Sequence, residues 1–149
     1  KVLSIEMFEA VGKEYWNSYF SKVREVLNKN GKALIQTITI DDALFDKYAR
    51  TTDFIQTYIF PGGLLASDGV FKSMANKFKL ETINTKSFAH DYAKTLEIWF
   101  HQFNDNWDEI SKLGFNDRFK KLWDFYLAYC RGGFLSTRIS VSQYLFEAK

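Results

Sequence analysis

The sequence predicts an α/β fold with a largely parallel sheet. Short apolar and β-branched runs alternate with longer amphipathic segments, and residues 2–40 hold a strand, a helix and a second strand, the size of one βαβ unit. The chain has 149 residues, of which 46% are hydrophobic and 26% are charged. That length and composition suit one globular domain with a sizeable core.

The first part of the chain predicts two strands around one helix. Residues 2–8 predict a short buried strand, and residues 13–28 predict a helix whose apolar side chains share one face. These side chains are Trp16, Phe20, Val23 and Leu27. The helix is expected to end at residues 28–31, where Gly31 can adopt a positive φ. Residues 32–40, KALIQTITI, are aliphatic and β-branched and predict the second strand.

The rest of the chain continues the alternation. In order, we expect a helical or irregular segment over residues 41–60, a helix over 69–78, a strand over 79–88, a long helix or helix pair over 90–114, a helix over 116–134 and a strand over 139–149. Asn116 is the expected N-cap of the last helix. Two aromatic stripes at helical spacing mark the two long helical segments: Trp99, Phe103, Trp107 and Ile110, then Phe119, Leu122, Trp123, Tyr126 and Cys130.

The composition argues against several classes of protein. A net charge of +2 without a basic run does not indicate a nucleic acid partner. The single cysteine, Cys130, excludes an internal disulfide and favours a reducing compartment such as the cytoplasm. No segment reaches the ~20 apolar residues of a membrane-spanning helix. His90 and His101 have no partners at metal-ligand spacing, so no metal site is expected.

Polar residues follow the first two predicted strands. Glu9 lies just past the first strand, and the segment Gln36–Ile38 lies near the end of the second. Because parallel strands present their carboxyl ends at one edge of a sheet, we expect these residues side by side at the rim. From the residues alone, a solvated acid at a strand end is the simpler interpretation of Glu9. No glycine-rich turn follows a strand, and Gly62–Gly63 follow Pro61, so no nucleotide-binding turn is predicted.

Several blocks of the sequence occur in the order typical of one family. They are SIEMFEAVG (4–12), VLNKNGKALIQTITI (26–40), DFIQTYIFPGG (53–63), FAHDYAKTLEIW (88–99) and RFKKLWDFYLAYCRGGF (118–134). With these blocks the chain resembles the cyclopropane-fatty-acyl-phospholipid synthases, a family that includes the mycolic acid cyclopropane synthases. The resemblance implies the C-terminal half of a Rossmann-like class I methyltransferase sheet, with inserted helices that form a lipid site. Residues 1–149 would form part of one domain, beginning at the sheet's fourth strand, with the half that grips S-adenosylmethionine absent.

The resemblance also implies a chemistry and a set of site residues. The family transfers a methyl group from S-adenosylmethionine to a cis double bond of a lipid acyl chain, and a bound bicarbonate removes a proton to close the ring. The bicarbonate ligands would be Glu9, Gln36, Ile38 and Tyr92. Glu9 and Tyr92 would be catalytic, and Cys130 occupies a position also marked as an active-site residue of the family. Phe54, Tyr58 and Phe60 would shape the acyl pocket, where aromatic faces favour a carbocation.

The resemblance leaves other functions open. Gln36 stands where many members have His, and an amide donates a hydrogen bond but carries no proton at neutral pH. An enzyme that stops at a methyl- or methylene-branched acyl chain, or one that methylates an amine, is therefore an alternative. A non-catalytic lipid-binding or interaction module is the alternative from another class. The expected partner is a phospholipid acyl chain, met by a cytoplasmic protein at the membrane surface, and no oligomeric state is predicted.

Overall fold

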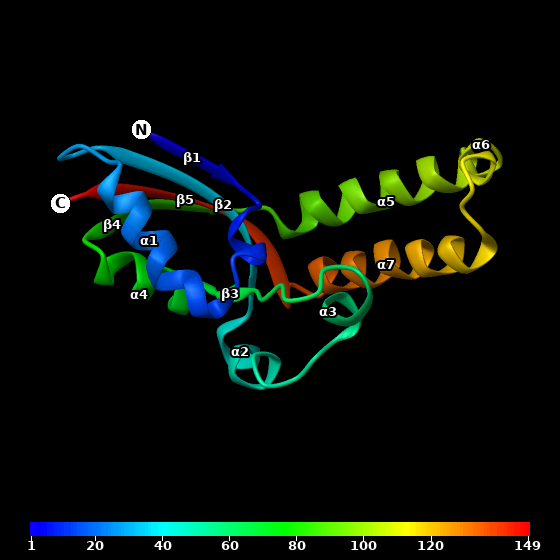
Figure 1. The fold of residues 1–149 in the computed structure, drawn as a ribbon, viewed down its shortest axis with the longest axis horizontal. Helices are drawn as coiled ribbons and strands as arrows, with labels where there is room; N and C mark the ends of the chain where they lie inside the picture. Colours follow the sequence, from blue (N-terminus) through cyan, green and yellow to red (C-terminus); the bar gives the residue numbers. More distant parts are fainter. The chain divides into compact units, whose positions relative to one another are not determined.

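A computed structural model describes residues 1–149, which divide into two compact units. The first unit combines residues 1–88 with residues 139–149, and the second comprises residues 89–138. Figure 1 shows the sheet and its helices in the first unit and a hairpin of long helices in the second. The α/β class predicted from the sequence is confirmed in the first unit, which carries every strand.

The sheet of the first unit has the order β1-β2-β5-β4, with β3 added to the end of β2. Its strands are β1 (Val2–Ile5), β2 (Lys32–Ile40), β3 (Ala66–Ser67), β4 (Leu80–Ser87) and β5 (Ile139–Ala148). β1 and β3 run parallel to β2, whereas β5 runs antiparallel to both β2 and β4. β4 therefore points the same way as β1, β2 and β3, so the expectation of a largely parallel sheet is confirmed, and β5 is the one reversed strand.

The reversal of β5 has a topological cause. The chain leaves the sheet at the end of β4 and re-enters it at the same end, where Ser87 pairs with Ser142 and the Phe88 N–H donates to the Val141 carbonyl at 2.8 Å. A chain that returns to the end it left must run back along its neighbour. Alternating strand and helix patterns alone do not distinguish this return from a crossover, which would give a parallel strand.

The helices of the first unit are short. They are the 3₁₀ turns η1 (Phe8–Ala10) and η2 (Lys13–Tyr15), followed by α1 (Trp16–Glu25), α2 (Asp42–Tyr48), α3 (Phe54–Tyr58) and α4 (Asp68–Lys77). One face of the sheet packs against α1 and α4 to form the core (Figure 1). Its fully buried side chains include Phe8, Phe20, Ile35, Phe71, Tyr144 and Phe146.

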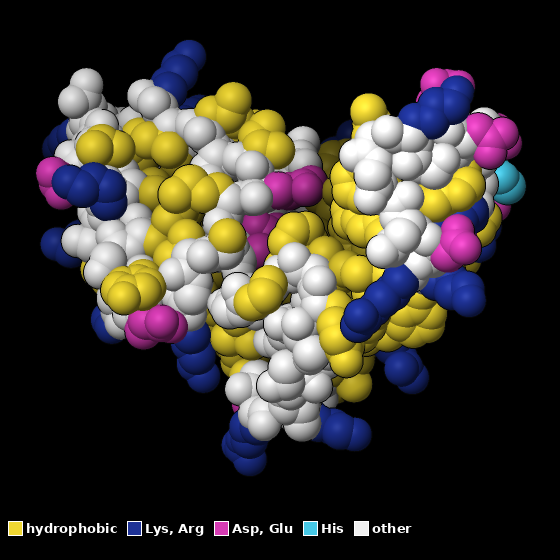
Figure 2. Space-filling model, turned by 45° about the vertical axis from the view of Figure 1, so that its right-hand side comes forward, with side chains coloured by type: hydrophobic (Ala, Val, Ile, Leu, Met, Phe, Trp, Pro, Cys, Tyr) yellow, Lys and Arg dark blue, Asp and Glu magenta, His cyan; other side chains and the backbone are white.

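The first strand is shorter and more exposed than predicted. β1 ends at Ile5, and it alternates instead of being buried throughout, with Leu3 67% and Ile5 56% exposed. It pairs only with β2 and so forms one edge of the sheet. An apolar groove lies between this edge and α1, lined by Val2, Leu3, Ile5, Met7, Tyr19, Val23 and Val26. Hydrophobic side chains on the surface are visible in Figure 2.

The turn before β2 corrects the role expected of Gly31. The residue with positive φ is Asn30, at 60°, and not Gly31. Asn is one of the few residues with a side chain that tolerates this conformation. Gly31 is needed for close packing instead, because a Cβ there would lie 2.7 Å from the carbonyl oxygen of Asn28.

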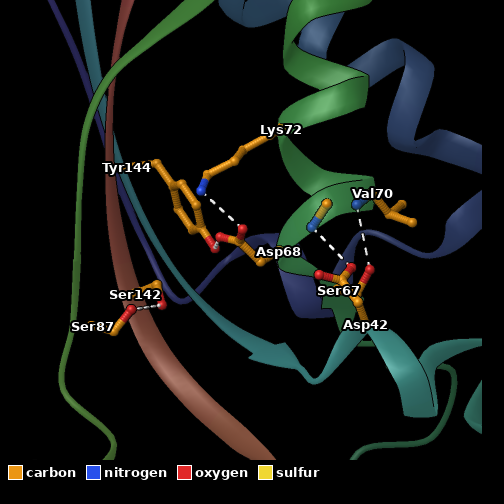
Figure 3. A network of polar contacts seen from close by, with 9 residues as sticks. Asp42, Ser67, Asp68, Val70, Lys72, Ser87, Ser142 and Tyr144 are labelled. Atoms are coloured by element: carbon orange, nitrogen blue, oxygen red, sulfur yellow. Dashed lines mark hydrogen bonds and ion pairs between the residues drawn. The ribbon is translucent and has the colours of Figure 1, made fainter.

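A polar network joins the start of α4 to the sheet (Figure 3). The buried Tyr144 hydroxyl on β5 donates to Asp68 Oδ1 at 2.8 Å, and Lys72 Nζ lies 2.8 Å from Asp68 Oδ2. The Ser67 hydroxyl accepts from the Val70 N–H, which caps α4. Burial, with the Asp68 carboxylate beside the phenol, strongly raises the pKa of Tyr144, so this hydroxyl stays protonated and remains a donor.

The second unit is an antiparallel helical hairpin. It consists of α5 (Ala89–Asp105), α6 (Trp107–Lys112) and α7 (Asp117–Leu135), so the expected helix pair and final helix are confirmed. Asn116 caps α7 as predicted, its Oδ1 accepting from the Phe119 N–H at 3.0 Å. Bonds along the hairpin include Glu97 with Arg131 at 2.6 Å and Asn104 with Asp124 at 2.7 Å. None of the helices has the length and apolar character needed to cross a membrane.

Candidate functional site

Glu9 lies in the turn that follows β1, in η1. The neighbouring Phe8 anchors this turn, because its ring is buried and packs within 5.2 Å of Trp16 and 4.9 Å of Phe71, measured between ring centroids. The Glu9 carbonyl accepts from the Leu64 N–H at 3.0 Å, which ties the turn to the segment after α3. The backbone of Glu9 is therefore held from both sides.

The Glu9 carboxylate has one bonded and one unbonded oxygen. Oε1 accepts from the backbone N–H of Ile38 at 2.5 Å, whereas Oε2 is buried and accepts no hydrogen bond. Burial raises the pKa of Glu9, and the Glu6 carboxylate adds to this rise. Hydrogen bonding to the Ile38 N–H and the Thr37 hydroxyl lowers the pKa, but by less than burial raises it. The expectation that Glu9 and the end of β2 lie side by side at the rim is confirmed for Ile38.

Gln36 is held by two neighbours that the sequence analysis did not single out. Its Nε2 donates to Glu6 Oε1 at 2.8 Å, and its Oε1 accepts from Gln143 Nε2 at 2.9 Å. Gln143 lies directly opposite Gln36 in the β2–β5 ladder, so the two side chains share one face of the sheet. A signal was available for Glu6, an acid within residues 2–8, the segment predicted as a buried strand. Gln143 is paired only through the antiparallel register, which was not predicted.

The other proposed catalytic residues belong to the helical hairpin. Tyr92 is half-buried on α5, and its ring lies 4.8 Å from the Phe134 ring on α7 and 6.3 Å from Trp99, measured between centroids. Cys130 is half-buried on α7 and forms no disulfide. Glu9, Gln36 and Ile38 are therefore grouped in the first unit, whereas Tyr92 and Cys130 lie in the second.

The aromatic residues proposed for the acyl pocket lie on and after α3. The rings of Phe54 and Tyr58 are 5.6 Å apart, and the side chains of Tyr58 and Phe60 are 62% and 57% exposed. Asp53 and Gln56 form a reciprocal capping box at the start of the helix. The Gln56 amide also donates to the Gly63 carbonyl at 3.0 Å. The next residue, Leu64, donates its N–H to the Glu9 carbonyl, so α3 and the Glu9 turn are bonded to adjacent residues.

The N-termini of α2 and α4 do not fit a cofactor. The start of α2 is capped by the Asp41 carboxylate, which accepts from the Ala43 N–H at 2.8 Å. At the start of α4, Asp42 Oδ1 accepts from the Gly69 N–H at 3.0 Å. These N–H groups are already bonded to acids of the chain itself, and neither turn is glycine-rich. We therefore assign no S-adenosylmethionine contact to these turns.

The architecture matches that of class I S-adenosylmethionine-dependent methyltransferases. A sarcosine dimethylglycine methyltransferase from Galdieria sulphuraria, 15% identical, shares the fold over 97% of this chain and 51% of its own with a TM-score of 0.76. The mycolic acid cyclopropane synthase CmaA1, complexed with SAH and CTAB, is 28% identical, with a TM-score of 0.88 over 97% of this chain and 54% of its own.

The family follows from the sequence comparisons. The family model for mycolic acid cyclopropane synthetase matches residues 1–144, and the chain belongs to this family. Tuberculostearic acid methyltransferase UfaA1 of Mycobacterium tuberculosis is 35% identical over 96% of this chain and 34% of its own length. Cyclopropane-fatty-acyl-phospholipid synthase of Escherichia coli is 32% identical over 99% of this chain and 37% of its own. The chain thus spans about a third of the length of these two relatives.

Proposed function

We propose that this chain is the C-terminal part of a single S-adenosylmethionine-dependent methyltransferase domain that modifies acyl chains of membrane lipids. Membership of the family supports the class of reaction, and coverage of 34% to 54% of the relatives supports the partial length. The open edge of β1 and the apolar groove beside it are where further sheet could be added. The full-length protein would join this chain to the remaining length that its relatives have.

The reaction that we propose is methylation of a cis double bond followed by closure of a cyclopropane ring. S-adenosylmethionine would supply an electrophilic methyl group, held by residues outside this chain. Bicarbonate would supply the base for the proton that is lost when the ring closes. The substrate would be a phospholipid acyl chain, reached by the protein at the membrane surface.

One observation carries the assignment of the bicarbonate site, namely the unbonded, buried oxygen of Glu9. A buried carboxylate oxygen without a donor is costly unless a ligand supplies one, and the hydroxyl of bicarbonate is such a donor. The Ile38 N–H holds the other oxygen, so this group would position Glu9. Gln36 and Tyr92 would donate to the remaining oxygens of the anion. Phe54, Tyr58 and Phe60 would line the path of the acyl chain. Cys130 would be an active-site residue that does not bind the anion.

Isotope transfer tests this proposal. The full-length protein is incubated with vesicles of an unsaturated phospholipid and with S-adenosylmethionine carrying a ¹³C-labelled methyl group. We expect ¹³C in the lipid, with ring protons at the high-field edge of the proton spectrum. A matched incubation with a fully saturated phospholipid should give no label. Lipid that stays unlabelled from a folded, cofactor-binding protein would contradict the proposal and favour a lipid-binding module.

Methylation without ring closure is the second candidate. Two observations favour it: Gln36 is an amide where many members have His, and a relative at 35% identity is named a methyltransferase and not a cyclopropane synthase. In the same experiment this candidate predicts ¹³C in a methyl or methylene branch and no high-field ring signal.

A further inference from the structure

Three polar side chains form a row along one face of the sheet, from the residue that follows β1 through β2 to β5. Gln143 donates to Gln36, and Gln36 donates to Glu6, at 2.9 Å and 2.8 Å. The register places Gln36 directly opposite Gln143. Glu6 follows Ile5, the residue of β1 that pairs with Gln36, and its positive φ takes it out of the regular strand geometry. The face opposite, with Ile35 and Thr37, is buried in the core. Gln36 and Gln143 are therefore placed by the sheet itself, whereas Glu6 completes the row as an exposed side chain at its edge.

The two neighbours fix which way the Gln36 amide points. An ionised Glu6 accepts but cannot donate, so it requires the NH₂ group of Gln36 on its side. Gln143 then donates to the oxygen on the other side, and an amide flip would break both bonds. Gln36 Nε2 has two N–H groups, of which Glu6 takes one. The other N–H would then be available to a ligand near Glu9, whose carboxylate accepts from Ile38, two residues further along β2.

The backbone at Glu6 gives a reason to assign it a role beyond folding. Its φ is 48°, a region that is unfavourable for residues with a side chain and that glycine adopts freely. The Glu6 N–H donates to the Gln36 carbonyl at 2.8 Å, a bond that glycine would also make. Folding alone would therefore be served better by glycine at this position, and the carboxylate is what glycine lacks.

We infer that Glu6 and Gln143 are positioning residues for Gln36, which they orient as a fixed hydrogen-bond donor to the anion bound at Glu9. The inference rests on the function proposed above. A histidine ring is held by its own rigidity and two ring nitrogens, whereas a glutamine side chain has three rotatable bonds before its amide. Glu6 and Gln143 supply the rigidity that a glutamine side chain lacks. The Gln36 amide, which does not titrate at neutral pH, can then act as the hydrogen-bond donor at the site.

The test is the dependence of ring formation on bicarbonate, measured with the full-length protein in decarbonated buffer to which bicarbonate is added back. We expect Glu6→Gly and Gln143→Leu each to raise the half-saturating bicarbonate concentration about fivefold, the loss expected for one oriented hydrogen bond. The maximal rate should stay within about twofold, because the base itself is unchanged. Glu6→Gln keeps an acceptor oxygen and should stay close to the wild type.

Stability measurements separate positioning from a structural role. Glu6→Gly should melt at the same temperature as the wild type or higher, since it relieves the positive φ. Glu147→Gln, on the same strand face as Gln143 but outside the row, is the matched control and should leave the bicarbonate dependence unchanged. Unaltered half-saturation in both row variants, or a loss of activity that follows a lower melting temperature, would overturn the inference. A wild type that forms product without any bicarbonate dependence would instead remove the proposed bicarbonate site, and the inference with it.

Discussion

The backbone N–H of Ile38 donates to Glu9 Oε1 at 2.5 Å, across the end of the parallel β1–β2 pair. This single bond leaves Glu9 Oε2 buried and unbonded, and burial raises the pKa of the carboxyl group. A carboxylate placed in this way destabilises the free protein slightly and is ready to accept one donor. Such groups are common where a ligand completes the hydrogen bonding.

The first prediction concerns Glu9 and stability. A buried acid with a raised pKa favours the protonated form in the folded state, so the stability it permits is fully present below its ordinary pKa of 4.5. That stability is lost as the pH rises through the raised value. Glu9→Gln keeps an oxygen for the Ile38 N–H and removes the charge. In the full-length protein it should raise the melting temperature at pH 7, with a gain that shrinks towards pH 4. An equal gain at both pH values would contradict this account.

The second prediction concerns Tyr92. In the full-length protein Tyr92→Phe should lower the rate of ring formation about 100-fold, because removing one preorganised donor costs on the order of 3 kcal/mol of transition-state stabilisation. The ring packs against Phe134 and Trp99, and phenylalanine preserves these ring contacts. The binding of S-adenosylmethionine, followed by calorimetry, should be unchanged. A rate equal to that of the wild type would exclude Tyr92 from the anion site.

The third prediction compares two bonds to Asp68. Tyr144 is fully buried, so Tyr144→Phe removes a buried hydrogen bond and should cost about 1–2 kcal/mol of unfolding free energy. Lys72 and Asp68 are 37% and 44% exposed, so Lys72→Met should cost less than about 1 kcal/mol. Denaturant unfolding of the two variants checks the order. A larger loss for Lys72→Met would contradict it.

The fourth prediction concerns the 149-residue chain on its own. The N–H groups at the starts of α2 and α4 are bonded to acids of the chain itself, and β1 leaves an open apolar edge with Leu3, Ile5 and Met7 exposed. We therefore expect weak or undetectable cofactor binding by calorimetry, and self-association in sedimentation experiments. Micromolar cofactor binding, or a monomer with a sharp melt at high temperature, would argue against the proposed division of the domain.

Local patterns predicted the elements well, and pairing across the sheet poorly. The predicted strand over residues 32–40 and the predicted Asn116 cap agree with the structure, because both depend only on residues adjacent in the sequence. The reversed direction of β5 was not predicted, because it depends on where the chain returns after the helical hairpin, which no local period encodes. The row of Glu6, Gln36 and Gln143 was not predicted for the same reason, because its contacts join residues far apart in the sequence. Glu9 beside Ile38 could be predicted because β1 and β2 are parallel, as the βαβ pattern indicated.

The most direct test of the central claim is the lipid product of the full-length Glu9→Gln variant beside that of the wild type. Both are incubated with unsaturated phospholipid vesicles, S-adenosylmethionine and bicarbonate, and the ring protons are quantified by NMR. Because Glu9 is the acid whose free oxygen would accept the bicarbonate hydroxyl, the variant should form ring at about 1% of the wild-type rate, equal to about 3 kcal/mol. Its affinity for S-adenosylmethionine should match that of the wild type. Undiminished ring formation by Glu9→Gln would contradict the assignment of the anion site to Glu9.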